Sequence, residues 1–280
     1  MHRREIGMRT ALCLCGLVGG DKGKAGSGSS SEILRIGHKH YNQNLITPNN
    51  ADVFVHTWTV DKKESIEEMY SPKSSIYEPQ IQFDIPKYVK GTAVRKNNHY
   101  SKWYSIAKSI GLKSEYEKEN NFTYDWVIVA RFDIALNTVF DFGQLDNTKF
   151  YAGHWCEILD KKGTDVLRGG RGSLYDLLKT KKLSDFSHKH KGFPHTNEGL
   201  IDQWFLGNSK DMDKFSNLYN RLDDYTKPGK CPTDSADTIS NHRLSLYHLE
   251  ETGLADRLEF AYHLHDDFPL VRRRFLNCKL

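Results

Sequence analysis

The sequence predicts an α/β fold in which a mainly parallel sheet is covered by helices on both faces. Three apolar, β-rich segments, residues 9–18, 51–58 and 125–132, alternate with two segments of helical periodicity, residues 32–46 and 100–120. Such alternation is typical of parallel sheets, because a chain that returns to the same edge of a sheet needs a crossover, usually a helix. The sequence therefore favours a sandwich of one sheet between two helical layers.

The first half of the chain gives the clearest signals. "RTALCLCGLV" (9–18) predicts a buried strand, and the helix that follows at 32–46 should end before Pro48. "ADVFVHTW" (51–58) predicts a second strand, and an amphipathic helix follows with Asp61 as its N-cap. We expect a short strand and then a mobile loop within residues 71–98.

The second half is more polar and its elements are less regular. The expected elements are a strand at 149–158, an inserted loop region at 160–196 with a short helix at 173–178, a segment at 198–208 that begins as a helix or turn and ends as a strand, and helices at 210–225 and 240–258. We find no internal repeat. We expect an N-terminal extension at 1–7 and one domain at 8–280, with a nucleotide-binding half at about 8–150 and an acceptor half at about 151–280.

The composition is that of a globular protein that does not need nucleic acid as a partner. The 280 residues are 38% hydrophobic and 27% charged, with a net charge of +4. So mild an excess of positive charge suits an anionic small molecule equally well. We expect no nucleic-acid partner.

The cysteine pattern and the N-terminus favour a cytoplasmic location. The five cysteines are odd in number and contain no Cys-x-x-Cys, which is typical of reduced thiols. The apolar stretch at 11–18 is short and is followed by no small-residue cleavage site, so we interpret it as a strand and not as a signal peptide. No run approaches the roughly 18 apolar residues of a membrane helix.

A glycine-rich loop, "GGDKGKAGSGSS" (19–30), follows the first strand, where phosphate-binding loops occur. The Walker pattern fails, because Val18 replaces its first glycine and Ala25 its Ser/Thr. The dinucleotide pattern also fails, because Gly26 and Gly28 are followed by Ser31. The loop therefore supports neither an ATPase nor a Rossmann dehydrogenase.

The position and charge of this loop still suit a pyrophosphate. Gly16 ends the strand, and Lys22 and Lys24 lie in the loop. Ligands of open α/β sheets bind outside the carboxyl ends of the strands. We expect these three residues to contact a bound pyrophosphate; the alternative is a solvated, flexible loop.

"YDWVIVARFDIAL" (124–136) places two charged residues at the end of an apolar strand. Asp133 would lie at the ligand-binding edge, where a carboxylate can hold a divalent cation. Arg131 lies two residues earlier, so both side chains face the same way. Its guanidinium can pair with a phosphate or with Asp133. The alternative is a structural ion pair that closes the strand.

Several blocks taken together resemble a family of viral and microbial glycosyltransferase-like proteins of the GT-A type. These blocks are "ADVFVHTW", "YEPQIQF", "WYSIAKSI", "YDWVIVARFDI", "FYAGHW", "IDQWFLGNS" and "SNHRLSLYHL". The resemblance covers about residues 9–275 and implies a GT-A-like, Rossmann-type sandwich that binds a nucleotide-diphosphate sugar with Mn²⁺ or Mg²⁺. In that family a DxD motif holds the metal and the donor diphosphate. Here Arg131-Phe132-Asp133 occupies its place, so either Asp133 binds the metal with other ligands or Arg131 partly replaces its charge.

The resemblance also implies site residues in the second half of the chain. In "IDQWFLGNS", Asp202 would be a general base, and Gln203 would contact the donor. Glu198, four residues before Asp202, would share a helical face with it. By a looser analogy, His265 would be a further metal ligand. The alternative for Asp202 is a local cap or ion pair.

The expected function is transfer of a sugar from a nucleotide-diphosphate donor to a glycan or other hydroxyl acceptor, in the host cytoplasm if the source is viral. Two alternatives stay open. One is a nucleotidyltransferase or nucleotide-sugar hydrolase with similar pyrophosphate geometry. The other is a non-catalytic carbohydrate- or nucleic-acid-binding protein with a degenerate site, which is favoured by the missing first acid and by the basic stretch at 179–191.

Overall fold

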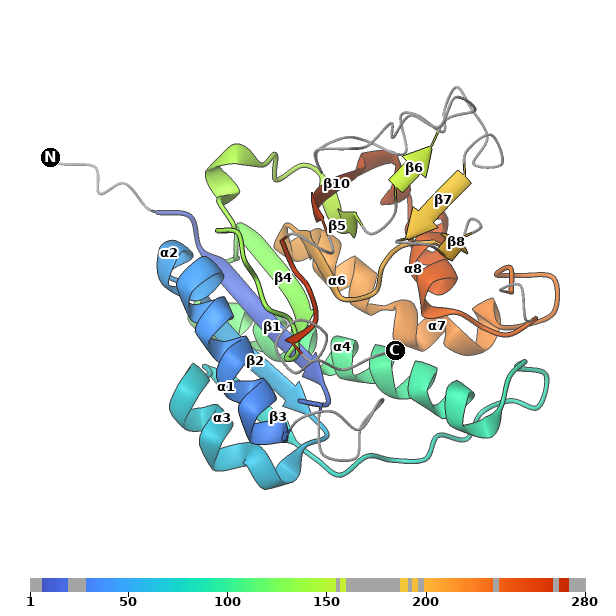
Figure 1. Ribbon diagram of the computed structural model, residues 1–280, viewed down its shortest axis with the longest axis horizontal. Helices are drawn as coiled ribbons and strands as arrows, with labels where there is room; N and C mark the ends of the chain where they lie inside the picture. Colours follow the sequence, from blue (N-terminus) through green and yellow to red (C-terminus); the bar gives the residue numbers. More distant parts are fainter. Residues whose placement is uncertain are drawn as a thin grey trace, which may run out of the picture.

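The protein is built on one seven-stranded sheet whose strand order is β10-β5-β9-β4-β1-β2-β3 (Figure 1). The computed structural model describes residues 7–19, 29–154, 157–159, 187–190, 193–195, 199–233, 237–263 and 267–271. Every pair of neighbouring strands in this sheet is parallel except those of β9, which is antiparallel to β4 and β5. The predicted α/β fold with a mostly parallel sheet is confirmed.

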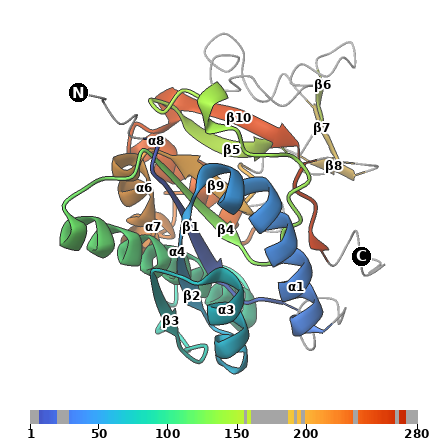
Figure 2. The ribbon, with the colours of Figure 1, turned by 90° about the vertical axis from the view of Figure 1, so that its left-hand side faces the viewer.

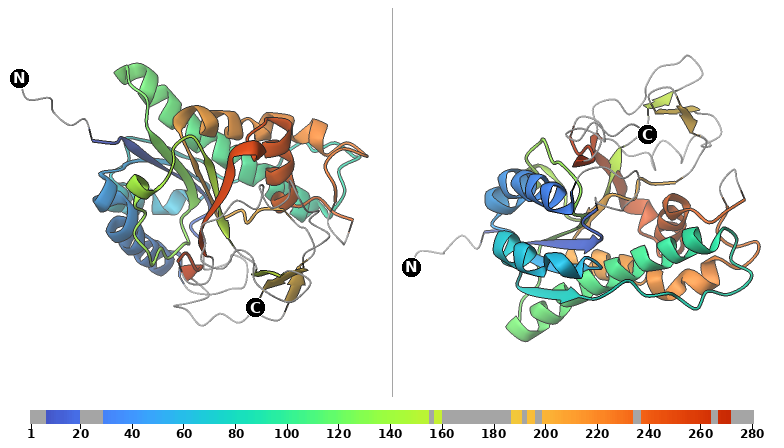
Figure 3. Two further views of the ribbon diagram at one scale, coloured as in Figure 1. Left: turned by 90° about the horizontal axis from the view of Figure 1, so that it is seen from above. Right: turned by 60° about the horizontal axis from the view of Figure 1, so that its bottom comes forward.

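The strands of the large sheet come from both halves of the chain. They are β1 (Thr10–Gly16), β2 (Asp52–Thr57), β3 (Ser74–Tyr77), β4 (Trp126–Arg131), β5 (Phe150–His154), β9 (Trp204–Gly207) and β10 (Leu258–His263). A separate small sheet contains β6 (Glu157–Leu159), β7 (Ser187–His190) and β8 (Phe193–His195), and it lies outside the large sheet (Figure 3). Because β4 pairs with β9, the two expected halves share one sheet.

Helices cover both faces of the large sheet (Figure 2). On one face lie α1 (Ser30–Tyr41), which continues through a π-helical turn at Asn42–Ile46 into α2 (Thr47–Asn49), and α3 (Lys63–Tyr70). On the other lie α4 (Ala93–Asn120), α6 (Ser209–Ser216), α7 (Leu218–Tyr225) and α8 (Asn241–Glu251). Short 3-10 turns occur at Val60–Lys62, Phe142–Gln144 and Ala255–Arg257.

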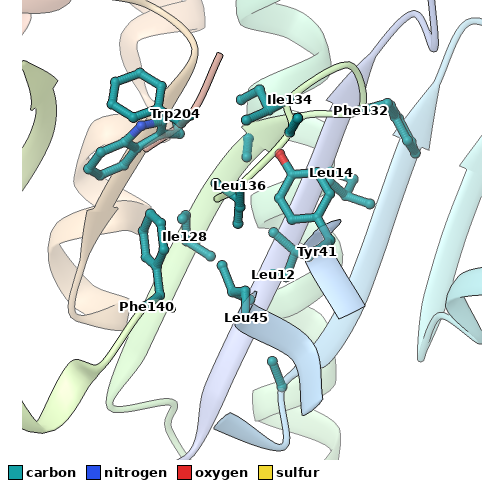
Figure 4. Packing of buried hydrophobic residues seen from close by; sticks show 14 of the residues in the cluster. Leu12, Leu14, Tyr41, Leu45, Ile128, Phe132, Ile134, Leu136, Phe140 and Trp204 are labelled. Carbon is teal, nitrogen blue, oxygen red and sulfur yellow. The ribbon is translucent and has the colours of Figure 1, made fainter. Parts of the chain in front are cut away.

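β1 lies between β2 and β4 and is buried on both faces. Successive side chains of a strand point to opposite faces. Leu12 and Leu14 therefore pack with the α1 layer, while Ala11 and Cys13 pack with the α4 layer. Figure 4 shows the first of these layers, in which Leu12 and Leu14 meet residues of α1 and β4. This double burial explains the continuous apolar run in the sequence.

Two predicted boundaries before the fourth strand are wrong. α4 begins at Ala93, because the Thr92 hydroxyl accepts a hydrogen bond from the Arg95 N–H at 3.2 Å and caps the helix. The polar residues 93–98, expected in a loop, are therefore helical. Asp61 does not cap α3, whose first residue follows a 3-10 turn that contains Asp61.

Two further predictions fail in the second half. The expected helix at 210–225 is two helices that meet at Asn217. The expected helix at 240–258 ends at Glu251, and the chain then forms β10, which pairs with β5.

Residues 199–203 are irregular, so no helix carries Asp202. The short helix expected at 173–178 lies outside the described residues. None of the helices in the described ranges has the length and hydropathy of a membrane span.

A buried lysine joins α4 to α6. The Lys113 side chain is fully buried, and its Nζ lies 3.0 Å from Glu117 Oε2, 2.7 Å from Asp213 Oδ1 and 2.6 Å from Ser209 Oγ. Glu117 in turn accepts the Tyr124 backbone N–H at 2.7 Å, next to the start of β4. The ammonium thus satisfies polar groups from two helices in the apolar layer beneath the sheet.

Replacing Lys113 with methionine should destabilise the protein, because it leaves the carboxylate of Glu117 buried without a cation. We expect a loss of about 3–5 kcal/mol in the free energy of unfolding, measured by urea denaturation. Lys118→Met, an exposed change on the same helix, should change it by less than about 0.5 kcal/mol. Equal effects of the two substitutions would show that the buried network contributes nothing specific.

Candidate functional site

The carboxyl end of β1 is the topological switch point of the sheet. From β1 the chain passes to β2 and β3 on one side, and it returns to β4 on the other side of β1. In open α/β sheets, the crevice at such a reversal is where ligands bind. Cys15 and Arg131 are register partners there, and Gly16 follows. The charged residues predicted for the site converge on this point.

Gly16 shapes the end of β1. Its φ of +90° is a conformation that favours glycine. Its N–H donates to the Ser105 hydroxyl at 2.7 Å, and its carbonyl accepts from the Thr57 hydroxyl at 2.8 Å. Both backbone groups of Gly16 are thus engaged within the protein, so the expected contact with a pyrophosphate would not be made by its N–H.

A buried histidine stabilises this turn. His56 Nδ1 lies 2.7 Å from the Ser105 hydroxyl, and Nε2 lies 2.9 Å from Glu78 Oε1. Burial lowers the pKa of His56, although hydrogen bonding to Glu78 opposes the shift. The Ser105 hydroxyl is fully buried, so this Glu-His-Ser chain supports the strand end and does not present a nucleophile.

Arg131 and Asp133 form a bidentate ion pair. Nε and Nη2 of Arg131 each donate to one carboxylate oxygen of Asp133 at 2.8 Å. The Asp133 side chain is 2% exposed, while that of Arg131 is 31% exposed. Although burial opposes it, the charge of Asp133 raises the pKa of Arg131. The carboxylate thus fixes a guanidinium that still reaches solvent.

Gly19 lies beside this pair. A Cβ atom built on Gly19 would be 3.9 Å from Oδ2 of Asp133. Gly19 is the last described residue before the glycine- and lysine-rich segment at 20–28. Lys22 and Lys24 lie outside the described residues, and their predicted contact with a pyrophosphate stays a prediction.

Asp202 forms a second ion pair, with Lys102 of α4. Lys102 Nζ lies 2.5 Å from Oδ2 of Asp202 and also donates to its backbone carbonyl. His242 Nε2, in the first turn of α8, lies 3.5 Å from Oδ1. Burial opposes the shift, but Lys102 and then His242 hold the pKa of Asp202 well below its usual range. Burial lowers the pKa of Lys102, although Asp202 opposes this.

A glycine brings α8 to Asp202. Gly199 has a φ of +92°, and a Cβ there would lie 2.0 Å from the His242 carbonyl oxygen. Only glycine allows this approach, and the Leu200 N–H donates to the same carbonyl at 3.0 Å. The irregular segment that leads to β9 is thereby held against the first turn of α8, next to Asp202.

The two ion pairs lie around the end of β1. Burial raises the pKa of Cys15 to about 12. Lys102 and Arg131 lower this pKa by their charges, whereas Asp202 and Asp133 raise it. Cys15, which pairs in register with Arg131, therefore lies near both ion pairs. The thiol itself stays protonated and is a poor nucleophile.

Two buried acceptors beside the second pair have no partner in the described part of the chain. Asn241 Oδ1 accepts from Trp103 Nε1 at 3.0 Å and lies 2.7 Å from His99 Nδ1, which must therefore carry the proton. His99 Nε2 is thus an unprotonated acceptor, and it is buried without a partner. Burial lowers the pKa of His99 to about 4. Gln203 Oε1 is also buried and unpaired, while its backbone carbonyl accepts the Arg131 N–H at 3.2 Å.

The described residues do not fit a divalent cation at Asp133. Both of its oxygens are engaged by Arg131, and the described residues contain no group of three side chains suited to hold a metal ion. His265, expected as a further ligand, lies outside the described residues, as does Glu198. The requirement for Mn²⁺ or Mg²⁺ therefore stays a prediction, while the alternative in which Arg131 supplies the positive charge agrees with the pairing.

Sequence reasoning missed Lys102, His99 and His242. Each lies on a helix, and each acquires its partner across a long sequence separation that local periodicity does not indicate. Lys102 follows His99 by three residues, so both lie on one face of α4. This spacing is the one signal in the sequence that could have indicated them as a pair of site residues.

Replacing Asp202 with asparagine should reduce stability in a pH-dependent way. The pKa of Asp202 is lower in the folded than in the unfolded state, so its contribution is present above the unfolded pKa and is lost as the pH falls through the folded pKa. At pH 7 we expect a loss of about 3 kcal/mol, because Lys102 keeps its charge without a counterion.

The measurement is urea denaturation between pH 7 and the acid limit of the fold. The difference between wild type and Asp202→Asn should shrink below about pH 4, near the ordinary pKa of aspartate. Asp84→Asn makes the same change at an exposed site and is the matched control; it should change the free energy of unfolding by less than about 0.5 kcal/mol. A constant difference at all pH values would contradict the depressed pKa.

The chain matches no protein-family model, and no curated protein matches it in sequence. Its function is therefore inferred from the geometry of the switch point.

Proposed function

We propose that the protein is a glycosyltransferase that binds a nucleotide-diphosphate sugar at the carboxyl end of β1 and β4 and transfers the sugar to a hydroxyl acceptor. One observation carries the proposal. Two partly exposed cations, Arg131 and Lys102, are held by carboxylates at the switch point, next to unpaired buried acceptors. The cations suit a diphosphate, and the acceptors suit the hydroxyl groups of a sugar.

The position of the cations supports a diphosphate ligand. Nucleotide ligands of open α/β sheets place their phosphates at the switch point. Arg131 is fixed by Asp133 and keeps a third of its side chain exposed, so it is preorganised to donate to an anion. Gly19, beside Asp133, leads into residues 20–28, and we expect Lys22 and Lys24 of that segment to add positive charge to the same region.

The unpaired acceptors support a hydroxyl-rich ligand. A buried acceptor without a donor is costly, and a ligand O–H directed at it removes that cost. His99 lies near the Lys102–Asp202 pair, since both residues act on its pKa, and Gln203 is joined through its backbone carbonyl to Arg131. Sugar hydroxyl groups supply such donors.

The reaction breaks the bond between the anomeric carbon and the diphosphate oxygen and forms a bond from that carbon to the acceptor oxygen. The diphosphate leaves with the electron pair, and the acceptor hydroxyl loses its proton to the departing diphosphate or to water. Arg131 and Lys102 would stabilise the charge that grows on the leaving group. This arrangement would use fixed side-chain cations where related chemistry uses a metal ion.

In the observed geometry, Asp202 is better suited to position Lys102 than to accept a proton. A carboxylate whose pKa lies well below its usual range is a weak base near neutral pH. Its contact with Lys102 would hold that ammonium toward the diphosphate. The general-base expectation for Asp202 requires that Lys102 and His242 move away when substrate binds.

One observation favours the alternative of a binding protein without turnover. Both carboxylate oxygens of Asp133 accept hydrogen bonds from Arg131, so the acid expected to hold a metal ion is already neutralised. A protein of this kind would bind a nucleotide sugar or carbohydrate at the same strand ends but would not cleave the donor.

Mass spectrometry of the products tests these functions. Full-length protein is incubated with UDP-, GDP-, CMP-, TDP- and ADP-linked sugars and hydroxyl acceptors. An acceptor that gains the mass of one sugar residue from a UDP-, GDP-, TDP- or ADP-linked donor supports the proposal. Release of free sugar without acceptor indicates a hydrolase, a new phosphoanhydride indicates a nucleotidyltransferase, and binding without product indicates a binding protein; each of these three contradicts it.

With an active donor, Arg131→Met should lower the rate of transfer by about 100-fold, because a fixed donor to the leaving group is lost. Lys118→Met removes a distant exposed cation and is expected to leave the rate unchanged. Circular dichroism and the melting temperature establish that both variants are folded. A folded Arg131→Met variant with full activity would remove Arg131 from the donor site.

A further inference from the structure

A pocket of about 300 Å³ lies away from the switch point, between the loop that follows α7 and the start of α8. Its walls include the lysines 90, 227 and 230, one aspartate, Asp237, and the hydroxyl-bearing Ser240. Tyr88, Ile239 and Leu244 supply apolar surface. The pocket therefore combines a positive wall with an apolar one.

The lysines differ in their partners. Lys90 Nζ lies 2.6 Å from Asp237 Oδ2, and Lys227 Nζ lies 3.0 Å from Asp224 Oδ1. Lys230, which lines the same pocket, makes no ion pair within the described residues, although its charge contributes to lowering the pKa of Asp224. An unpaired ammonium among two paired ones leaves the pocket with a positive field that an anion would neutralise.

Ser240 is the second, independent feature. It occupies the N-cap position of α8, an 11-residue helix, but its hydroxyl makes no capping hydrogen bond, and the first turn has no acidic residue. Ser240 is 7% exposed and lines the pocket, and no hydrogen bond of its hydroxyl occurs in the described part of the chain. The start of a helix carries unpaired N–H groups and a partial positive charge. An unpartnered hydroxyl and a helix N-terminus thus face the same space.

We propose that this pocket binds a phosphate monoester of a compact polar or cyclic molecule, such as a sugar monophosphate, with the phosphate between Lys230, Ser240 and the N-terminus of α8. A pocket of this volume exceeds what an isolated phosphate needs and lies at the lower end of the range for small-molecule sites. The apolar side formed by Tyr88, Ile239 and Leu244 would cover the body of the ligand. This site is independent of the proposed donor site.

The first turn of α8 joins this pocket to the switch point. Ser240 lines the pocket, Asn241 Oδ1 accepts from Trp103 Nε1 at 3.0 Å, and His242 Nε2 lies 3.5 Å from Asp202. A phosphate held at the start of α8 would therefore stabilise the turn that carries His242.

Isothermal titration of the full-length protein with glucose 6-phosphate, inorganic phosphate and glucose tests the proposal. Glucose 6-phosphate should bind more tightly than either of the others. Lys230→Glu should weaken its binding by about tenfold or more, because it removes a charge-assisted contact. Ser240→Ala should weaken it by about fivefold without lowering the melting temperature, because the hydroxyl caps nothing in the free protein.

Lys118→Glu makes the same change of charge at an exposed site elsewhere and should leave the affinity unchanged. The proposal is overturned if glucose 6-phosphate does not bind at millimolar concentration, or if Lys118→Glu weakens it as much as Lys230→Glu does. It is also overturned if inorganic phosphate binds as tightly, since the body of the ligand would then contribute nothing. None of these results depends on nucleotide-sugar turnover.

Discussion

The burial of β1 on both faces is the constraint on which the rest of the structure depends. Because α1 packs on one face and α4 on the other, the middle of β1 accepts only apolar or neutral side chains. Charged groups can therefore gather only where the strand ends. The strands on either side of β1 are parallel to it, so the charged residues that follow or lie above them meet at a single edge.

At that edge the charges are arranged as two pairs, and each pair keeps its cation partly accessible. The arrangement resolves a physical conflict. Unpaired cations beside a buried strand would be costly, whereas fully buried pairs could not meet a ligand. Asp133 is almost fully buried and fixes Arg131, and Asp202 fixes Lys102. The guanidinium and the ammonium each have further N–H groups, and these would donate hydrogen bonds to the proposed diphosphate.

Sequence reasoning reached the α/β class with a mostly parallel sheet, and it named the ion pair of Arg131 with Asp133 as one of two readings. The strand at 125–132 and the shared direction of Arg131 and Asp133 follow from local periodicity, which a single segment contains. The pair of Lys102 with Asp202 does not, because it joins residues a hundred positions apart, one on α4 and one in the irregular segment before β9. β10 was missed for a related reason. Its strand conformation depends on pairing with β5, which its own sequence does not indicate.

The central claim is that side-chain cations at the switch point bind a nucleoside diphosphate. The most direct measurement is thermal unfolding of the protein with UDP, GDP, TDP, CMP and ADP, in EDTA and again with Mn²⁺. A ligand that binds only the folded state stabilises it by about 2.7 kcal/mol at 100 times its dissociation constant. We predict selective stabilisation by one diphosphate in EDTA. No stabilisation by any nucleotide, or stabilisation that requires Mn²⁺, would contradict the claim.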